Sequence, residues 1–93
     1  MTNILVRLKV ADFAKWKPMY EANLISRKEA GLKEKSLLRG IDNPNEVVLL
    51  FETEDLKRAK AFTESSTLRE AQQKAGVIGT PDILFLNSEP VRH

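Results

Sequence analysis

Apolar residues along the chain follow two strand-like patterns. Residues 3–10 carry an apolar side chain at every even position, which predicts a strand with one buried face. Residues 46–52 instead contain an unbroken apolar run at 47–51, which predicts a strand covered on both of its faces. A less regular strand is expected over residues 33–40, and a last strand over residues 82–87.

A helical pattern separates the first two of these strands. Its apolar and aromatic residues recur at spacings of three and four: Phe13, Trp16, Tyr20 and Leu24. This spacing predicts one helix that Asp12 caps and that runs to about Ala30, with the recurring residues buried against the sheet. Pro18 predicts either a kink or a delayed start, because proline is well tolerated only in the first turn. Gly31 is expected to end the helix in a left-handed conformation.

A second helical region follows the third strand. Residues 53–55, of which Glu54 and Asp55 are acidic, open it. Its expected buried residues are Leu56, Ala59 and Phe62. The serines at 65–66 interrupt the helix, and residues 67–70 match a capping box that starts a further short helix ending near Gly76. We expect residues 79–81 to form a loop before the last strand.

The order of these elements predicts the fold class. Two strand–helix–strand halves in tandem are typical of a ferredoxin-like α+β fold, with a four-stranded antiparallel sheet and helices on one face. The strand at 46–52 has no polar side to expose, so something must cover the second face of the sheet. Because the chain is short, we expect a single domain over residues 1–88, followed by a loose tail over 89–93.

Composition limits the chemistry. The chain has 93 residues, no cysteine and one histidine, His93. This excludes disulfides, iron–sulfur clusters and cysteine zinc sites and argues against haem or a transition metal, so no cofactor is expected. The net charge of +2 is too small to imply nucleic acid, and the basic segment 27–39 is interpreted as solvated or, alternatively, phosphate-binding. No secretory leader or membrane-spanning run is recognised, so we expect a cytoplasmic protein without a membrane partner.

Several segments resemble one known family. They are residues 12–17, 42–48, 55–62, 68–71 and 75–77. These segments are similar to those of small bacterial proteins of the dimeric alpha–beta barrel superfamily, which are related to antibiotic biosynthesis monooxygenase domains and include cyclase-like members. The resemblance implies a homodimer in which two ferredoxin-like sheets pack face to face. Such packing would cover the apolar second face of the sheet.

The resemblance also implies a class of chemistry, from which this chain departs at two points. The superfamily's oxygenases act without a cofactor on aromatic or polyketide-like substrates, which they surround with asparagine, tryptophan, and tyrosine or arginine side chains. This chain has Glu54 where their tryptophan would follow the third strand, and it lacks the histidine of the haem-handling relatives. The fold and the dimer are therefore expected to carry over, whereas the reaction is not.

Five residues are candidates for a ligand site: Arg7, Trp16, Tyr20, Arg39 and Glu52. Trp16 and Tyr20 form an aromatic pair one turn apart, which either packs on the sheet or forms one wall of a pocket. Arg7 lies in the middle of a central strand, where a charge needs a partner or a ligand. It is expected to pair with Glu52, to orient a small anionic or phenolic ligand in a cavity between the sheet faces, or else to be a surface residue. Arg39 is interpreted as either a surface charge or a pocket residue.

Three classes of function remain open. The first is a cofactor-free oxygenase or cyclase that acts on an aromatic or polyketide-like substrate. The second is a non-catalytic ligand-binding or stress-related dimer. The third, RNA binding, is disfavoured because RNA-recognition domains of this topology need exposed aromatic residues on their central strands, and residues 3–10 contain none. No convincing acid–base pair is recognised, so the sequence predicts a small-molecule-binding dimer and names no catalytic residue.

Overall fold

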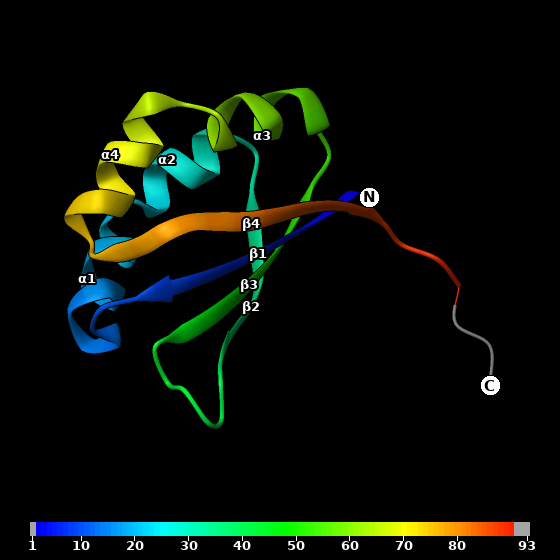
Figure 1. The fold of residues 1–93 in the computed structure, drawn as a ribbon. Helices are drawn as coiled ribbons and strands as arrows, with labels where there is room; N and C mark the ends of the chain where they lie inside the picture. The colour runs from blue at the N-terminus through cyan, green and yellow to red at the C-terminus, as the bar shows by residue number, and fades with distance from the viewer. Residues whose placement is uncertain (1, 91–93) are drawn as a thin grey trace.

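The computed structural model describes residues 2–90, which form a four-stranded antiparallel sheet with helices on one of its faces (Figure 1). In chain order the elements are β1 (Thr2–Val10), α1 (Phe13–Ala22), α2 (Leu24–Glu29), β2 (Lys33–Arg39), β3 (Glu46–Thr53), α3 (Leu56–Thr63), α4 (Ser66–Lys74) and β4 (Val77–Asn87). The strands lie in the order β2-β3-β1-β4, so that β1 and β3 are central. This arrangement confirms the predicted ferredoxin-like α+β fold.

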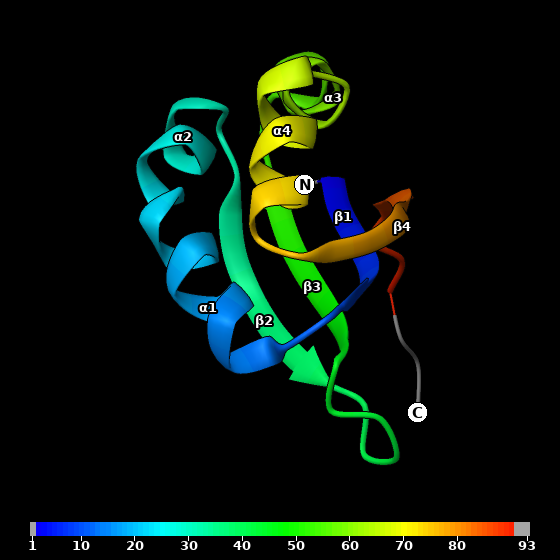
Figure 2. The same ribbon diagram turned by 60° about the vertical axis from the view of Figure 1, so that its left-hand side comes forward.

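The two faces of the sheet differ in how they are covered. The helices gather on one side of the strands (Figure 2), and the side chains facing them form the core. The central strands contribute Ile4, Val6, Leu8, Val10, Val47, Leu49 and Phe51 to this core, all of them buried. The strand register places Leu5 opposite both Leu50 and Leu84 on the other face, where none of the three is buried. β3 is therefore apolar on both faces, as predicted, and none of the helices within residues 2–90 covers its second face.

The predicted first helix is two helices, separated at Asn23. The Asn23 backbone has φ −91° and ψ 13°, and its side-chain amide donates to the Met19 carbonyl, so this asparagine competes with the regular helical ladder. Pro18 lies inside α1, which starts without delay at Phe13. The break changes which residues face the sheet: Leu24, predicted to be buried, is 42% exposed.

Gly31 ends α2 as the sequence predicted. Its φ of +79° is a left-handed conformation that a residue with a Cβ rarely adopts. The Gly31 N–H donates to the Lys28 carbonyl, and the Leu32 N–H donates to the Arg27 carbonyl. This pattern satisfies carbonyls at the end of the helix and turns the buried Leu32 back onto the core.

The second half of the chain differs from the prediction at two boundaries. Ser65 caps α4 by accepting from the Leu68 N–H, so this helix begins before the predicted capping box at 67–70. β4 begins at Val77 and includes the predicted loop 79–81. The pairing of β4 with β1 shifts register between Arg7 and Lys9, and Gly79 has a φ of +68°, so a bulge within the strand replaces the loop.

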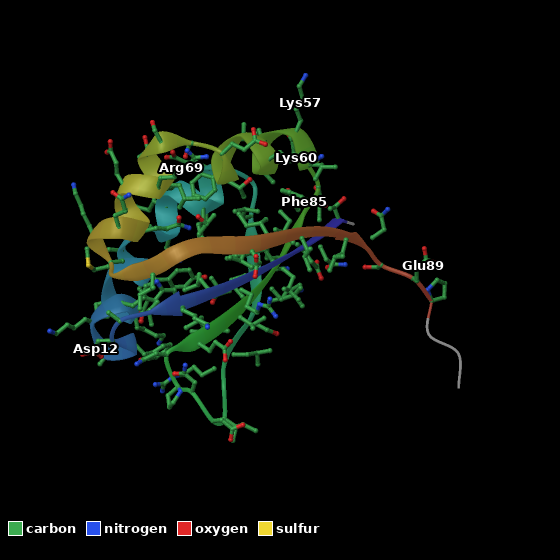
Figure 3. All side chains as sticks on the ribbon, in the orientation of Figure 1. Asp12, Lys57, Lys60, Arg69, Phe85 and Glu89 are labelled. Carbon is green, nitrogen blue, oxygen red and sulfur yellow. The ribbon has the colours of Figure 1, made fainter. Side chains whose placement is uncertain are left out.

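α3 lies across the sheet near the end of β4. Asp55 caps this helix by accepting from the Arg58 N–H at 3.0 Å. Figure 3 shows Lys60 of α3 beside Phe85 of β4, and the Lys60 ammonium nitrogen lies 5.2 Å from the centre of the Phe85 ring. This cation–π contact joins the helix to the edge strand.

Residues 88–90 follow β4 without regular structure, and the rest of the predicted tail, including His93, lies outside the described residues. Within the described part of the chain, no helix is long and apolar enough to cross a membrane.

Candidate functional site

A cavity of about 80 Å³ lies between the helices and the helix-covered face of the sheet. Its walls come from β1, β3 and β4 on one side and from all four helices on the other, and most of the lining side chains are apolar. Representative apolar lining residues are Val6, Trp16, Leu49, Phe62, Ala71 and Ile83. Polar groups are few, and Tyr20, Asn23 and Arg27 bring three of them from α1, α2 and the break between these helices.

Tyr20 is an aromatic residue of the cavity wall that carries a hydroxyl group. Its ring stacks on Trp16 with the ring centres 4.7 Å apart, so both predicted aromatic residues line the cavity wall. The Tyr20 Oη atom is buried, and it has no hydrogen-bond partner within residues 2–90. Burial raises the pKa of Tyr20 above its ordinary value, and the Glu34 carboxylate raises it further, while the Arg27 guanidinium opposes both. Tyr20 is therefore a neutral phenol, and its hydroxyl lies near the Glu34 carboxylate without meeting hydrogen-bond geometry.

Arg27 brings a positive charge to the same place. The residue is only 6% exposed, although the sequence suggested a solvated basic segment. Its Nη1 donates to the Tyr20 carbonyl at 2.7 Å, and its Cζ lies 3.7 Å from the centre of the Tyr20 ring. The sequence interpretation missed this residue. Its spacing of seven from Tyr20 and eleven from Trp16 matches one helix face, and this spacing could have identified it.

The aromatic stack continues away from the cavity toward the β2–β3 hairpin. The centres of the Phe13 and Trp16 rings are 5.6 Å apart, and the Arg39 Cζ lies 3.7 Å from the centre of the Phe13 ring. Arg39 Nε also donates to the Pro44 carbonyl at 2.9 Å. Arg39 is thus an exposed residue that packs on the Phe13 ring at the end of the stack away from the cavity. It does not line the cavity.

Arg7 and Glu52 lie on the opposite face of the sheet. Arg7 Nη2 is 3.0 Å from Asp82 Oδ2, and both side chains are more than half exposed. Glu52 instead lies 3.7 Å from Lys35, because the register sets Glu52 opposite Asn3 rather than opposite Arg7. The predicted Arg7–Glu52 pair is therefore wrong. The five predicted residues do not form one site, since Trp16 and Tyr20 line the cavity and Arg7 and Glu52 are on the other face.

The arrangement suits binding and polarisation better than proton abstraction. The described residues that line the cavity include no aspartate, glutamate or histidine that could act as a base. They offer the Tyr20 phenol, the Arg27 guanidinium, and the side chains of Asn23, Thr63 and Gln72 as hydrogen-bonding groups. Over residues 2–90, no cluster of three or more acidic or histidine side chains is placed to hold a metal ion.

The same fold occurs in solved structures. A Bordetella bronchiseptica protein assigned to the antibiotic biosynthesis monooxygenases superposes with a TM-score of 0.77 at 15% identity, over 96% of this chain and 97% of that one. SnoaB, a cofactor-independent oxygenase from Streptomyces nogalater, superposes with a TM-score of 0.74 at 14% identity, over 97% and 94%. A Caulobacter crescentus protein with the same assignment as the first has a TM-score of 0.67 at 18% identity, over 96% and 90%.

These similarities establish a shared fold. They confirm the expected resemblance to antibiotic biosynthesis monooxygenase-type domains at the level of architecture. No protein-family model and no curated protein sequence matches the chain.

Proposed function

We propose that this protein binds a small organic molecule in the cavity between the sheet and the helices. The observation that carries this proposal is the buried Tyr20 hydroxyl, which belongs to a residue of the cavity wall and has no hydrogen-bond partner within residues 2–90. A buried polar group without a hydrogen bond costs about 1–3 kcal/mol, so a bound molecule that accepts this bond is stabilised by it. The adjacent Arg27 adds a fixed positive charge.

The size of the cavity favours a small ligand over a polyketide-like one. A cavity of roughly 150 Å³ is known to hold benzene, whereas this cavity is about 80 Å³. A polycyclic substrate would require the helices to move away from the sheet. A molecule of a few carbon atoms fits without such movement.

A second candidate function is cofactor-free oxygenation of a small phenol or hydroquinone. The similarity to SnoaB, which is a cofactor-independent oxygenase, supports this candidate. A substrate of this kind would itself supply the electrons that reduce O₂. Oxygen uptake measured with a hydroquinone in the presence and absence of the protein tests it, and uptake that the protein does not accelerate would exclude this substrate class.

We also propose a cytoplasmic homodimer in which two copies pack through the uncovered face of the sheet. The support is apolar area on this face, since Leu38 is 56% exposed and Leu84 is 51% exposed. Val48 and Leu50 are half-buried between them on β3. Face-to-face packing would bury these residues and would leave the cavity on the outer, helix-covered side of each copy.

Trp16 provides a direct test of binding, because it is the only tryptophan in the chain and it lines the cavity. We would titrate phenols, quinones and short-chain acids while recording Trp16 fluorescence, and measure thermal unfolding in parallel. A ligand should change both signals. Ala71→Leu, which fills the cavity, should abolish the response, whereas Ala61→Leu on the exposed side of α3 should preserve it. A response that survives Ala71→Leu, or none from any compound, would overturn the proposal.

A further inference from the structure

We propose that the ligand of this cavity is a short-chain monocarboxylate, whose carboxylate group Arg27 and Tyr20 bind together. This inference rests on the proposed function and names the chemical class of the ligand. Three observations on the described residues support it: the charge balance at Arg27, the free donor on Tyr20, and the volume and lining of the cavity.

The first observation is a buried cation without an anion. Arg27 is 6% exposed, and it takes part in none of the ion pairs found over residues 2–90. A buried charge is costly unless a counter-charge and hydrogen bonds compensate it. The hydrogen bond to the Tyr20 carbonyl occupies only Nη1. Nε and Nη2 make no hydrogen bond within the described part of the chain and keep some accessible surface, and together they form the planar pair of donors that matches a carboxylate.

The second observation is the position of the Tyr20 hydroxyl. The guanidinium of Arg27 lies over the Tyr20 ring, so the two donors belong to one packed unit at the cavity wall. Because Tyr20 stays protonated, its hydroxyl offers a hydrogen, and the nearby Glu34 carboxylate does not meet hydrogen-bond geometry, so a better-placed acceptor is required. A carboxylate has two oxygens with enough lone pairs to accept from the guanidinium and from the phenol at once.

The third observation is the space for the rest of the ligand. Apart from the few polar groups, the lining of the cavity is aliphatic and aromatic, so it favours a hydrocarbon tail. The cavity measures about 80 Å³, which is about half of the roughly 150 Å³ that is known to hold benzene. This volume fits a small ligand with a short hydrocarbon tail. Propionate is therefore the appropriate probe, and propionamide is its neutral counterpart of nearly equal shape.

The test is a titration of the native protein with propionate, with propionamide and with sodium chloride at constant ionic strength, followed by Trp16 fluorescence. We expect propionate to bind at least tenfold more tightly than propionamide, and chloride to have no saturable effect. Tyr20→Phe should weaken propionate binding about three- to tenfold, and it should weaken propionamide, whose carbonyl also accepts a hydrogen bond, by no more than this. Lys28→Met, an exposed neighbour of Arg27 on α2, should bind propionate like the native protein.

Arg27→Lys probes the geometry of the charge. It keeps the positive charge and removes the planar pair of donors, so the preference for propionate over propionamide should fall below threefold. Circular dichroism checks that this variant is folded. If Arg27→Lys is not folded, Tyr20→Phe still tests the inference, because that change removes a single oxygen atom and keeps the ring.

Several results would overturn the inference. Equal affinity for propionate and propionamide would show that the cavity binds small molecules without selecting a carboxylate, and the proposed function would then stand alone. Unchanged propionate affinity in Tyr20→Phe would show that a buried water, rather than the ligand, satisfies the hydroxyl. If phenols bind and propionate does not, the inference is wrong and the proposed function stands. If none of the probes binds, both the inference and the proposed function are wrong.

Discussion

The Asn45 side chain accepts a hydrogen bond from the backbone N–H of Phe13, with Oδ1 and N 3.0 Å apart. Its Nδ2 also donates to the Ala11 carbonyl at 3.4 Å. Asn45 belongs to the β2–β3 hairpin, and Phe13 is the first residue of α1, so one amide group joins the hairpin to the helix. Because Phe13 starts the aromatic stack that ends at Tyr20, this link helps to fix the cavity wall.

Asn45→Ala should destabilise the protein. The substitution leaves the part-buried Phe13 N–H without its acceptor, and the loss of an equivalent helix-start contact costs about 1–2 kcal/mol. Urea unfolding measures this change in the free energy of unfolding. Asp42→Ala, in the same hairpin loop and exposed, serves as the control and should change stability by less than about 0.5 kcal/mol. Equal effects of the two substitutions would contradict the role assigned to Asn45.

Tyr20→Phe should raise the stability of the unliganded protein by about 1 kcal/mol. The substitution keeps the ring that stacks on Trp16 and removes only the buried hydroxyl that has no partner within residues 2–90. Thermal and urea unfolding of both proteins measure the difference. A loss of stability of similar size would show that the hydroxyl is hydrogen-bonded in solution, to the nearby Glu34 carboxylate or to a buried water.

The raised pKa of Tyr20 predicts a loss of stability at alkaline pH. Below the ordinary tyrosine pKa of about 10, Tyr20 is protonated in both states and does not affect the pH dependence. Above this value the unfolded chain loses the proton first, because burial keeps the folded pKa higher, so the free energy of unfolding falls as pH rises. The difference in stability between the native protein and Tyr20→Phe should show this fall.

The phenolate absorbance provides a separate measurement, because Tyr20 is the only tyrosine in the chain. The absorbance should not rise near pH 10 while circular dichroism still reports the folded state. It should rise at higher pH together with unfolding. A phenolate signal that appears near pH 10 in the folded protein would mean that the Tyr20 hydroxyl is open to solvent.

Arg27→Met should lower stability by about 1–3 kcal/mol. The substitution removes a charged hydrogen bond to the Tyr20 carbonyl and a cation–π contact with its ring, and relief of the buried charge offsets part of this loss. Lys28→Met changes the neighbouring, exposed residue and should be nearly neutral. Urea unfolding compares the two variants. Equal free energies of unfolding for Arg27→Met and Lys28→Met would indicate that Arg27 is not buried in solution.

Leu84→Lys should shift the protein from dimer toward monomer. Leu84 is 51% exposed on the uncovered face of the sheet, and a lysine there would have to be buried between the two copies. Light scattering at micromolar concentration measures the mass, which should be about twice the chain mass for the native protein. Ile41→Lys is the matched control, because Ile41 is 98% exposed in the hairpin loop. A native protein that is already monomeric would contradict the proposed dimer.

The strand pattern was predictable because the register of a sheet follows from alternation. The alternating side chains of residues 3–10 and 46–52 were assigned to the correct faces of the sheet. A shift of the strand register by one residue would expose the whole core, so the alternation is decisive. The end of α2 at Gly31 was equally clear, because few residues other than glycine accept a φ of +79°. The start of β4 was missed, because Gly79 and Pro81 suggest a turn, and only the pairing with β1 reveals a bulge.

The candidate site was harder to predict, because it depends on the break at Asn23 and on strand register. One continuous helix places both Leu24 and Arg27 with Trp16 and Tyr20, whereas the break at Asn23 exposes Leu24 and leaves Arg27 buried. A local asparagine interaction decides the exposure of Leu24, and periodicity alone does not detect it. The partner of Arg7 likewise depends on which residue of β4 lies opposite, and strand alternation identifies the face of a residue but not its neighbour.

The two edges of the sheet have a consequence for aggregation. The edge strand β2 begins with Lys33, Glu34 and Lys35, all exposed, and its pairing with β3 shifts register between Glu34 and Ser36. Charges and irregular pairing at an edge oppose the addition of another strand. The opposite edge, β4, contains a bulge and Pro81, which has no N–H to donate. A fibril grows only when both edges of each copy accept a strand, so this molecule resists open-ended growth through its sheet edges.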